Sequence, residues 1–219
     1  MPSAEVFIAF LTALLLLEIS PGPDMMLVMA RGIGQGRRTA LWTVFGMVFV
    51  AGLVQVSLLV LGLAALAASY PMALTALQWL GALYLVWLGA KTLLTPSMPL
   101  QQRQSGGSIS DWQAVRQGTV NSLTNPKSLL FMFAFLPQFV DPARGPVWAQ
   151  LLVLGSIQKL TGILSLGSIA LASGTIGQWL QRFPKMVAWQ EKFTGMVMVG
   201  LGVRLFLSDS AAGPTRPGA

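Results

Sequence analysis

The stretch Ile19-Ser20-Pro21-Gly22-Pro23-Asp24-Met25-Met26 places two prolines, a glycine and an acid inside hydrophobic sequence. Proline removes a backbone donor and breaks a helix, while Gly22 allows close approach of another helix. Carbonyls freed near Glu18 cannot face lipid without partners, so they must meet protein, water or a ligand. The stretch therefore predicts an interrupted span at 5–29, with Asp24 where the second half-helix begins.

The composition favours a membrane protein. Of 219 residues, 54% are hydrophobic and 10% are charged, whereas soluble domains carry roughly a quarter charged residues. The chain has no histidine and no cysteine, which excludes Ser-His and Cys-His catalysis, His-ligated zinc, iron–sulfur clusters and disulfides. A Walker-type phosphate loop is also absent from the sequence. We therefore expect no cofactor and no enzyme activity, and a gradient or a separate subunit as any energy source.

Six hydrophobic runs are long enough to cross a bilayer at about 20 residues each. They lie at 5–29, 39–68, 72–94, 113–138, 147–175 and 187–208. Because the runs are continuous and do not alternate, they predict helices, and the fold class is an all-α polytopic membrane protein. The first run lacks the positive n-region of a signal peptide, so it is interpreted as a retained span.

The runs divide into two halves within one membrane domain. We expect a first three-helix repeat at 1–94, a cytoplasmic linker at 95–112, a second repeat at 113–208 and a disordered tail at 209–219. Three spans per half give the halves opposite orientation, so they predict inverted repeats. The fourth span is interrupted by Thr124-Asn-Pro-Lys-Ser-Leu-Leu130, at the place that corresponds to the break in the first. Paired interruptions of this kind mark the binding site of a secondary transporter.

The basic residues predict the orientation. The net charge is +7, but most basic residues lie between or at the ends of hydrophobic runs, so membrane orientation explains them better than nucleic-acid binding. The connections after spans 1, 3 and 5 hold Arg31, Arg37, Arg38, Lys91, Arg103, Arg116, Arg182, Lys185 and Lys192. The opposite side holds Arg144, Arg204 and Arg216. The first set is therefore expected in the cytoplasm, with both termini outside.

Charged residues within the spans are the candidates for function. Asp24 either caps its half-helix or takes part in a site. Lys127 opposes the dipole of the helix it begins, so it either pairs with Asp24 or extends to the headgroups. Lys159 lies more than a turn inside the fifth span, where a charge is costly and usually functional or paired. Gln55 is expected to join helices by a hydrogen bond.

The predicted substrate and proton site collects the residues of both interruptions and the polar groups at the same depth. These are Glu18, Ser20, Pro21, Gly22, Pro23, Asp24, Asn125, Pro126, Lys127, Gln158 and Lys159.

Several motifs along the chain carry a resemblance to a known family. They are Ser20-Pro-Gly-Pro-Asp24, Gln35-Gly-Arg-Arg38, Gly81-Ala-Leu-Tyr-Leu-Val-Trp-Leu-Gly-Ala90, Asn125-Pro-Lys127 and Leu136-Pro-Gln-Phe-Val140. In order and spacing the chain resembles the LysE-type amino-acid exporters, in particular their homoserine/threonine efflux branch. The resemblance implies a six-span protein of the bacterial inner membrane that exports amino acids or related amphiphilic metabolites. It also implies coupling to protons and a homodimer.

Three functions are compatible with the sequence. In an exporter, a zwitterionic substrate would place its carboxylate at a half-helix N-terminus or a lysine, and its ammonium at Asp24 or freed carbonyls. A passive channel would line a water path with the same polar break. An enzyme without histidine would need a Ser-Lys or a carboxylate scheme, for example Ser156 or Ser165 with Lys159.

Overall fold

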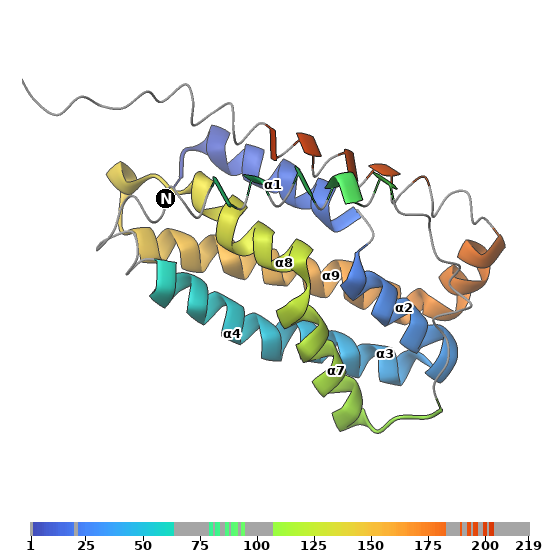
Figure 1. Ribbon diagram of the computed structural model, residues 1–219. Helices are drawn as coiled ribbons and strands as arrows, with labels where there is room; N and C mark the ends of the chain where they lie inside the picture. The colour runs from blue at the N-terminus through green and yellow to red at the C-terminus, as the bar shows by residue number, and fades with distance from the viewer. Residues whose placement is uncertain are drawn as a thin grey trace, which may run out of the picture.

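The computed structural model describes residues 2–19, 22–63 and 107–182, with short pieces between 79 and 94 and between 189 and 203. Every regular element among these residues is a helix (Figure 1), which confirms the all-α class for the described part of the chain. Ser20, Pro21 and the tail 209–219 lie outside the described residues, as do most of 72–94 and 187–208. The linker 95–112 is described only from Gly107 onward.

The first predicted span forms two helices, α1 (Ala4–Ile19) and α2 (Pro23–Gln35). Between them Gly22 is extended, with φ −145° and ψ 179°, and it is the N-cap residue of α2. Proline suits the first turn of a helix because its missing N–H would have no partner there. The extended Gly22 and the following Pro23 therefore start α2 as a helix separate from α1.

The described part of the second predicted span, up to Leu63, is one continuous helical rod. It consists of α3 (Arg37–Phe45), η1 (Gly46–Val50), α4 (Ala51–Ser57) and η2 (Leu58–Leu63), in which η1 and η2 are π-helical. Gly36 precedes the rod with a φ of 92°, a conformation that favours glycine and allows the sharp turn out of α2.

The fourth predicted span is interrupted at Asn125. It comprises α7 (Asp111–Thr124), α8 (Pro126–Leu130), the π-helical η4 (Phe131–Phe135) and the 3₁₀ helix η5 (Leu136–Phe139). A capping box starts α7, in which the Ser110 hydroxyl accepts from the Gln113 backbone N–H at 3.2 Å and Gln113 Oε1 accepts from the Ser110 N–H at 2.9 Å. This reciprocal pair satisfies two of the amides at a helix N-terminus.

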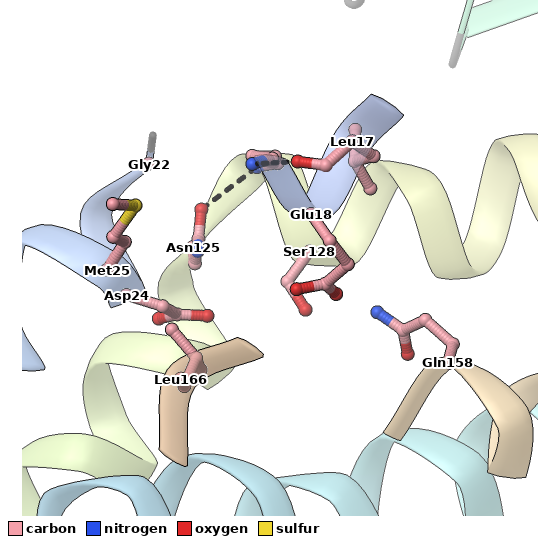
Figure 2. Close-up of a pocket in the computed structure, with 10 residues that line it drawn as sticks. Leu17, Glu18, Gly22, Asp24, Met25, Asn125, Ser128, Gln158 and Leu166 are labelled. Atoms are coloured by element: carbon pink, nitrogen blue, oxygen red, sulfur yellow. Dashed lines mark hydrogen bonds between the residues drawn. The ribbon is translucent and has the colours of Figure 1, made fainter. Parts of the chain in front are cut away.

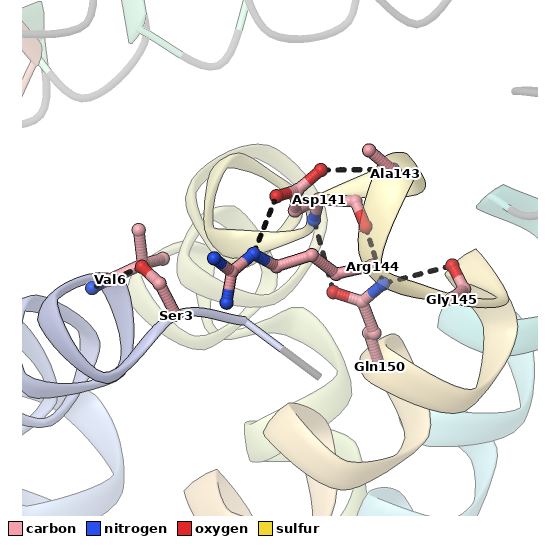
Figure 3. Close-up of polar contacts among 7 residues, drawn as sticks. All are labelled: Ser3, Val6, Asp141, Ala143, Arg144, Gly145 and Gln150. Carbon is pink, nitrogen blue, oxygen red and sulfur yellow. Dashed lines mark hydrogen bonds and ion pairs between the residues drawn. The ribbon is translucent and has the colours of Figure 1, made fainter.

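A short loop with the 3₁₀ turn η6 (Pro142–Arg144) leads into α9 (Val147–Arg182), a helix of 36 residues. The amide of Gln150, which is 2% exposed, holds this loop. Figure 3 shows Gln150 exchanging hydrogen bonds with the Asp141 backbone, at 3.0 Å and 2.8 Å, and donating to the Gly145 carbonyl at 3.1 Å. A buried amide with all these partners rigidifies the turn that joins the two helical segments.

The helix α9 runs lengthwise through the molecule (orange in Figure 1), between α1 and the rod that contains α4. It contacts α1, α2, α3 and α4. By length and composition, two helical stretches in the described part of the chain can cross a membrane, Arg37–Gly62 and Val147–Ser173. Leucines on these two stretches are strongly exposed, for example Leu53 at 73% and Leu164 at 71%, which is suited to lipid rather than water.

Close helix contacts depend on glycine. A Cβ atom at Gly118 of α7 would overlap the carbonyl oxygen of Thr43, and one at Gly46 would overlap the carbonyl oxygen of Val115. Outside the rod, a Cβ at Gly89 would lie 2.6 Å from the carbonyl oxygen of Gly195. Pieces of the predicted third and sixth spans therefore pack on each other, in the manner of small residues at membrane helix interfaces.

Candidate functional site

The two helix interruptions are built alike. Asp24 is the second residue of α2, after Pro23, and Lys127 is the second residue of α8, after Pro126. Each of these charged side chains reaches out of its own helix and contacts the last turns of the helix that precedes the other interruption. Asp24 of the first break therefore contacts the helix before the second break, and Lys127 of the second break contacts the helix before the first.

Lys127 contacts the end of α1. Its Nζ donates to the Leu17 carbonyl oxygen at 2.6 Å, and its side-chain stem lies against Gly22, where a Cβ would come within 3.0 Å of Lys127 Cδ. A cation at a helix C-terminus is favourable because the last carbonyls carry partial negative charge. The lysine that opposes the dipole of α8 therefore stabilises the C-terminal end of α1.

Asp24 contacts the end of α7. Asn121 Nδ2 donates to its carboxylate at 2.6 Å. The N-cap residue of α2 is Gly22 and makes no side-chain capping bond, so the interpretation of Asp24 as the cap is wrong. In the other break Asn125 is the N-cap, because its Oδ1 accepts from the Lys127 backbone N–H at 3.0 Å.

Lys159 of α9 takes part in a chain of hydrogen bonds that connects α9, α4 and α7. Its Nζ donates to Gln55 Oε1 at 2.5 Å, and Gln55 Nε2 donates to the Ser122 carbonyl oxygen at 3.0 Å. Gln55 is fully buried, which confirms its predicted role between helices. The stem of Lys159 lies on Gly52, where a Cβ would come within 3.1 Å of Lys159 Cδ, much as Lys127 lies on Gly22.

A polar cavity of about 60 Å³ lies between the two interruptions. Figure 2 shows Glu18 and Gln158 pointing toward each other across it, with Asp24 and Asn125 nearby. Glu18 accepts a hydrogen bond from the Ser165 hydroxyl at 2.5 Å. Gln158 is 6% exposed, and its Oε1 has no hydrogen-bond partner among the described residues. Buried polar atoms are normally satisfied, so this amide oxygen is an exception among the described residues.

The cavity gathers much of the predicted site. It is lined by Glu18, Gly22, Asp24, Asn125, Lys127 and Gln158, together with Leu17, Met25, Ser128 and Leu166. Electrostatic interactions link each of Lys127 and Lys159 to both Glu18 and Asp24. Pro23 and Pro126 open the two half-helices. Lys159 does not line the cavity.

Two residues at the site were not considered from the sequence. Asn121 contacts Asp24, and Ser128 lines the cavity. The available signal for Asn121 was its spacing of four residues before Asn125, which would put both amides on one helix face. Ser165, considered only as a nucleophile, donates to Glu18 instead. Among the described residues, no three acids group closely enough to hold a metal ion.

The fold and the site define a helical membrane protein whose interrupted helices enclose buried charges. The chain belongs to the LysE type translocator family, whose pattern matches residues 15–209. It is therefore a membrane transporter and not an enzyme.

Similar proteins match almost end to end. An uncharacterized membrane protein of Vibrio cholerae is 32% identical over 203 residues, which cover 92% of this chain and 96% of that protein. A leucine efflux protein of Enterobacter sp. is 28% identical, with 91% and 94% covered. A homoserine/homoserine lactone efflux protein of Salmonella typhimurium is 30% identical, with 89% and 93% covered. No solved structure matches the chain.

Proposed function

We propose that the chain exports amino acids or related small amphiphilic metabolites across the bacterial inner membrane, by proton antiport with alternating access. Two of the similar proteins are named for leucine efflux and for homoserine/homoserine lactone efflux. The polar cavity at the helix interruptions supports a site for a zwitterion, because it presents two carboxylates and a lysine at one place.

The proposal rests on the contacts that each helix break makes with the helix preceding the other break. Asp24 reaches Asn121 in the last turn of α7, while Lys127 reaches Leu17 in the last turn of α1. This reciprocity supports six spans arranged as two inverted three-helix repeats, 1–94 and 113–208. In such transporters the half-helix ends bind substrate where the repeats meet.

In the bound state the substrate carboxylate would lie near Lys127 and the N-terminus of α2, and its ammonium near Asp24 and Glu18. The two acids would also carry the counter-transported proton. A proton on a carboxylate removes the charge that attracts the ammonium, so protonation and substrate binding would exclude each other at this site. That exclusion is the basic requirement of an antiporter.

Contacts between α2, α3 and α7 close the end of the molecule predicted to face the cytoplasm. Arg31 donates to Gln117 of α7, and Arg38 forms an ion pair with Asp111 at 2.6 Å. Rocking of the two halves would separate these groups and open the cavity toward that side.

Transport by purified protein in liposomes tests the proposal. We expect an imposed pH gradient to drive saturable amino-acid efflux with counterflow, and Asp24→Asn to abolish it at normal protein levels. Glu5→Gln is the matched control, because Glu5 is an exposed acid in the first turn of α1 and should leave efflux unchanged. Flux that rises linearly with substrate and shows no counterflow would contradict the carrier mechanism and favour a passive channel.

The proposed orientation places both termini outside and the linker inside, in a homodimer. Because the chain has no cysteine, single cysteines report cleanly on topology. We expect Ser3→Cys to react with an impermeant thiol reagent from the periplasmic side, and Gly107→Cys to be protected in intact cells. Labelling of Gly107→Cys from outside would contradict the orientation. A single species of monomer size after crosslinking in membranes would contradict the dimer.

A further inference from the structure

A second, larger cavity adjoins the polar one. Its volume is about 420 Å³, and it is lined by Leu15, Glu18, Met25, Thr161, Leu164, Ser165 and Ile169. Glu18 and Met25 line both cavities, so they form the boundary between them. Leu15 and Leu164 are 56% and 71% exposed, so the larger cavity is a groove with one side toward lipid.

The polar cavity is too small for a whole amino acid with a large side chain. A water molecule needs about 10–15 Å³ of such space, so a volume of about 60 Å³ holds roughly four or five non-hydrogen atoms. The ammonium, Cα and carboxylate of an amino acid amount to about that many atoms. The side chain of any larger substrate must lie elsewhere, and the groove is the space that continues past Glu18 and Met25.

Two observations indicate that the polar cavity receives the head group. Gln158 lines the cavity and is 6% exposed, and its side-chain amide can form hydrogen bonds with the charged head group of an amino acid. The Glu18 carboxylate lies at the boundary with one oxygen bonded to Ser165. An ammonium held at Glu18, on the boundary between the two cavities, directs the Cα substituent toward the groove.

The groove itself is chemically apolar. Thr161 Oγ1 donates to its own helix, at 3.1 Å to Ile157 and 2.9 Å to Gln158 carbonyl oxygens. Ser165 donates to Glu18. Both hydroxyl protons are therefore used, and apart from Glu18 at the boundary the remaining lining consists of aliphatic and thioether side chains. Apolar walls of this kind favour an apolar substituent over one that must lose its hydration.

We propose that the transported substrate is a neutral amino acid with a bulky apolar side chain, its head group in the polar cavity and its side chain in the groove between α1, α2 and α9. This assignment rests on the proposed export function. It favours leucine or phenylalanine over alanine, homoserine and lysine as cargo.

Equilibrium binding to the purified full chain in nanodiscs tests the assignment, with leucine, phenylalanine, alanine, homoserine and lysine as the probes. We expect leucine to bind about tenfold or more tightly than alanine or homoserine, in the range by which apolar pockets distinguish side chains. Thr161→Phe fills the groove and should weaken leucine binding by about tenfold or more while changing alanine binding less than about twofold. The matched control is Leu160→Phe, one residue earlier on α9 and 58% exposed, which should leave both affinities unchanged.

Leu164→Trp fills the groove from its lipid side and provides a second variant if Thr161→Phe fails to fold. Equal affinity for all five amino acids, or equal loss of leucine and alanine binding in the variants, would overturn the groove assignment and leave the export function standing. Unchanged leucine binding in a folded groove variant would overturn it as well. If the wild type binds none of the five, the export proposal and this inference fail together.

Discussion

The contact between Lys159 and Gln55 makes a quantitative prediction about stability. Replacing Gln55 by leucine keeps the side-chain size but removes the acceptor of Lys159 and the donor to the Ser122 carbonyl oxygen. A hydrogen bond to a charged group contributes about 1.5–3 kcal/mol and a neutral one about 0.5–1.5 kcal/mol. We therefore expect Gln55→Leu to lower the free energy of unfolding by about 2–4 kcal/mol.

Adding Lys159→Met to Gln55→Leu should recover part of the lost free energy of unfolding. Lys159→Met removes the ammonium that Gln55→Leu leaves without its acceptor, and replacing both partners of a buried bond by apolar groups is less costly than replacing one. Polar contacts between membrane helices reach coupling energies of at most about 1.7 kcal/mol. Because one partner is charged, we expect a coupling energy near that maximum, at about 1.5 kcal/mol.

Steric trapping of the unfolded protein in bicelles measures these free energies without harsh denaturants. The control is Gln138→Leu, because the Gln138 amide donates only within its own helical segment, to Ala134 at 3.0 Å, and should cost less than about 1 kcal/mol. If the two single effects simply add, within about 0.5 kcal/mol, the Lys159–Gln55 contact does not stabilise the helix packing and the reasoning is refuted.

Three further substitutions test other contacts. Gly118→Ala places a methyl group on the Thr43 carbonyl oxygen and should destabilise the protein by about 1–3 kcal/mol in the same assay. Gly22→Ala pushes on the flexible Lys127 side chain, so stability should change by less than about 1 kcal/mol while liposome efflux falls about tenfold through loss of one charged hydrogen bond. Arg38→Gln breaks an ion pair that is 81% exposed on the arginine side and should cost less than about 1 kcal/mol.

Glycines without close neighbours serve as controls for Gly118→Ala and Gly22→Ala. A Cβ at Gly62 or at Gly34 would meet no atom within 4 Å, so Gly62→Ala and Gly34→Ala should change neither unfolding nor efflux appreciably. If Gly118→Ala matched Gly62→Ala in stability, the close approach of α7 to the rod would be contradicted. Normal efflux by Gly22→Ala would mean that the position of the Lys127 ammonium does not matter for transport.

The interruptions could be predicted from sequence because local chemistry determines them. Proline without an N–H and glycine without a Cβ act on their own backbone, so the breaks at Gly22 and Asn125 need no knowledge of distant residues. The same holds for Asn125 as a helix cap. The predicted fifth span, 147–175, also coincides with most of α9, because a continuous apolar run implies a helix in lipid.

The partners of the charges could not be predicted, because they come from distant parts of the chain. Lys127 contacts Leu17 across 110 positions and Asp24 contacts Asn121 across 97. A backbone carbonyl carries no sequence signal, so nothing in residue identity marks Leu17 as a partner. The π-helical segment Gly46–Val50 is similar, since its register depends on the packing of the rod against α7.

The length of α9 has a mechanical consequence. Its 36 residues extend about 54 Å at about 1.5 Å per residue, whereas the hydrocarbon layer is about 30 Å thick. Even at a tilt of about 40° the helix covers about 41 Å of depth, so it passes beyond the hydrocarbon layer. Polar residues gather in the sequence of its last turns, Gln178, Gln181 and Arg182, which puts the surplus turns at the Arg182 end. A change of tilt by about 10° moves one end of such a rod by about 9 Å relative to the other. Small rotations of α9 inside the membrane therefore produce large displacements of its Arg182 end at the membrane surface.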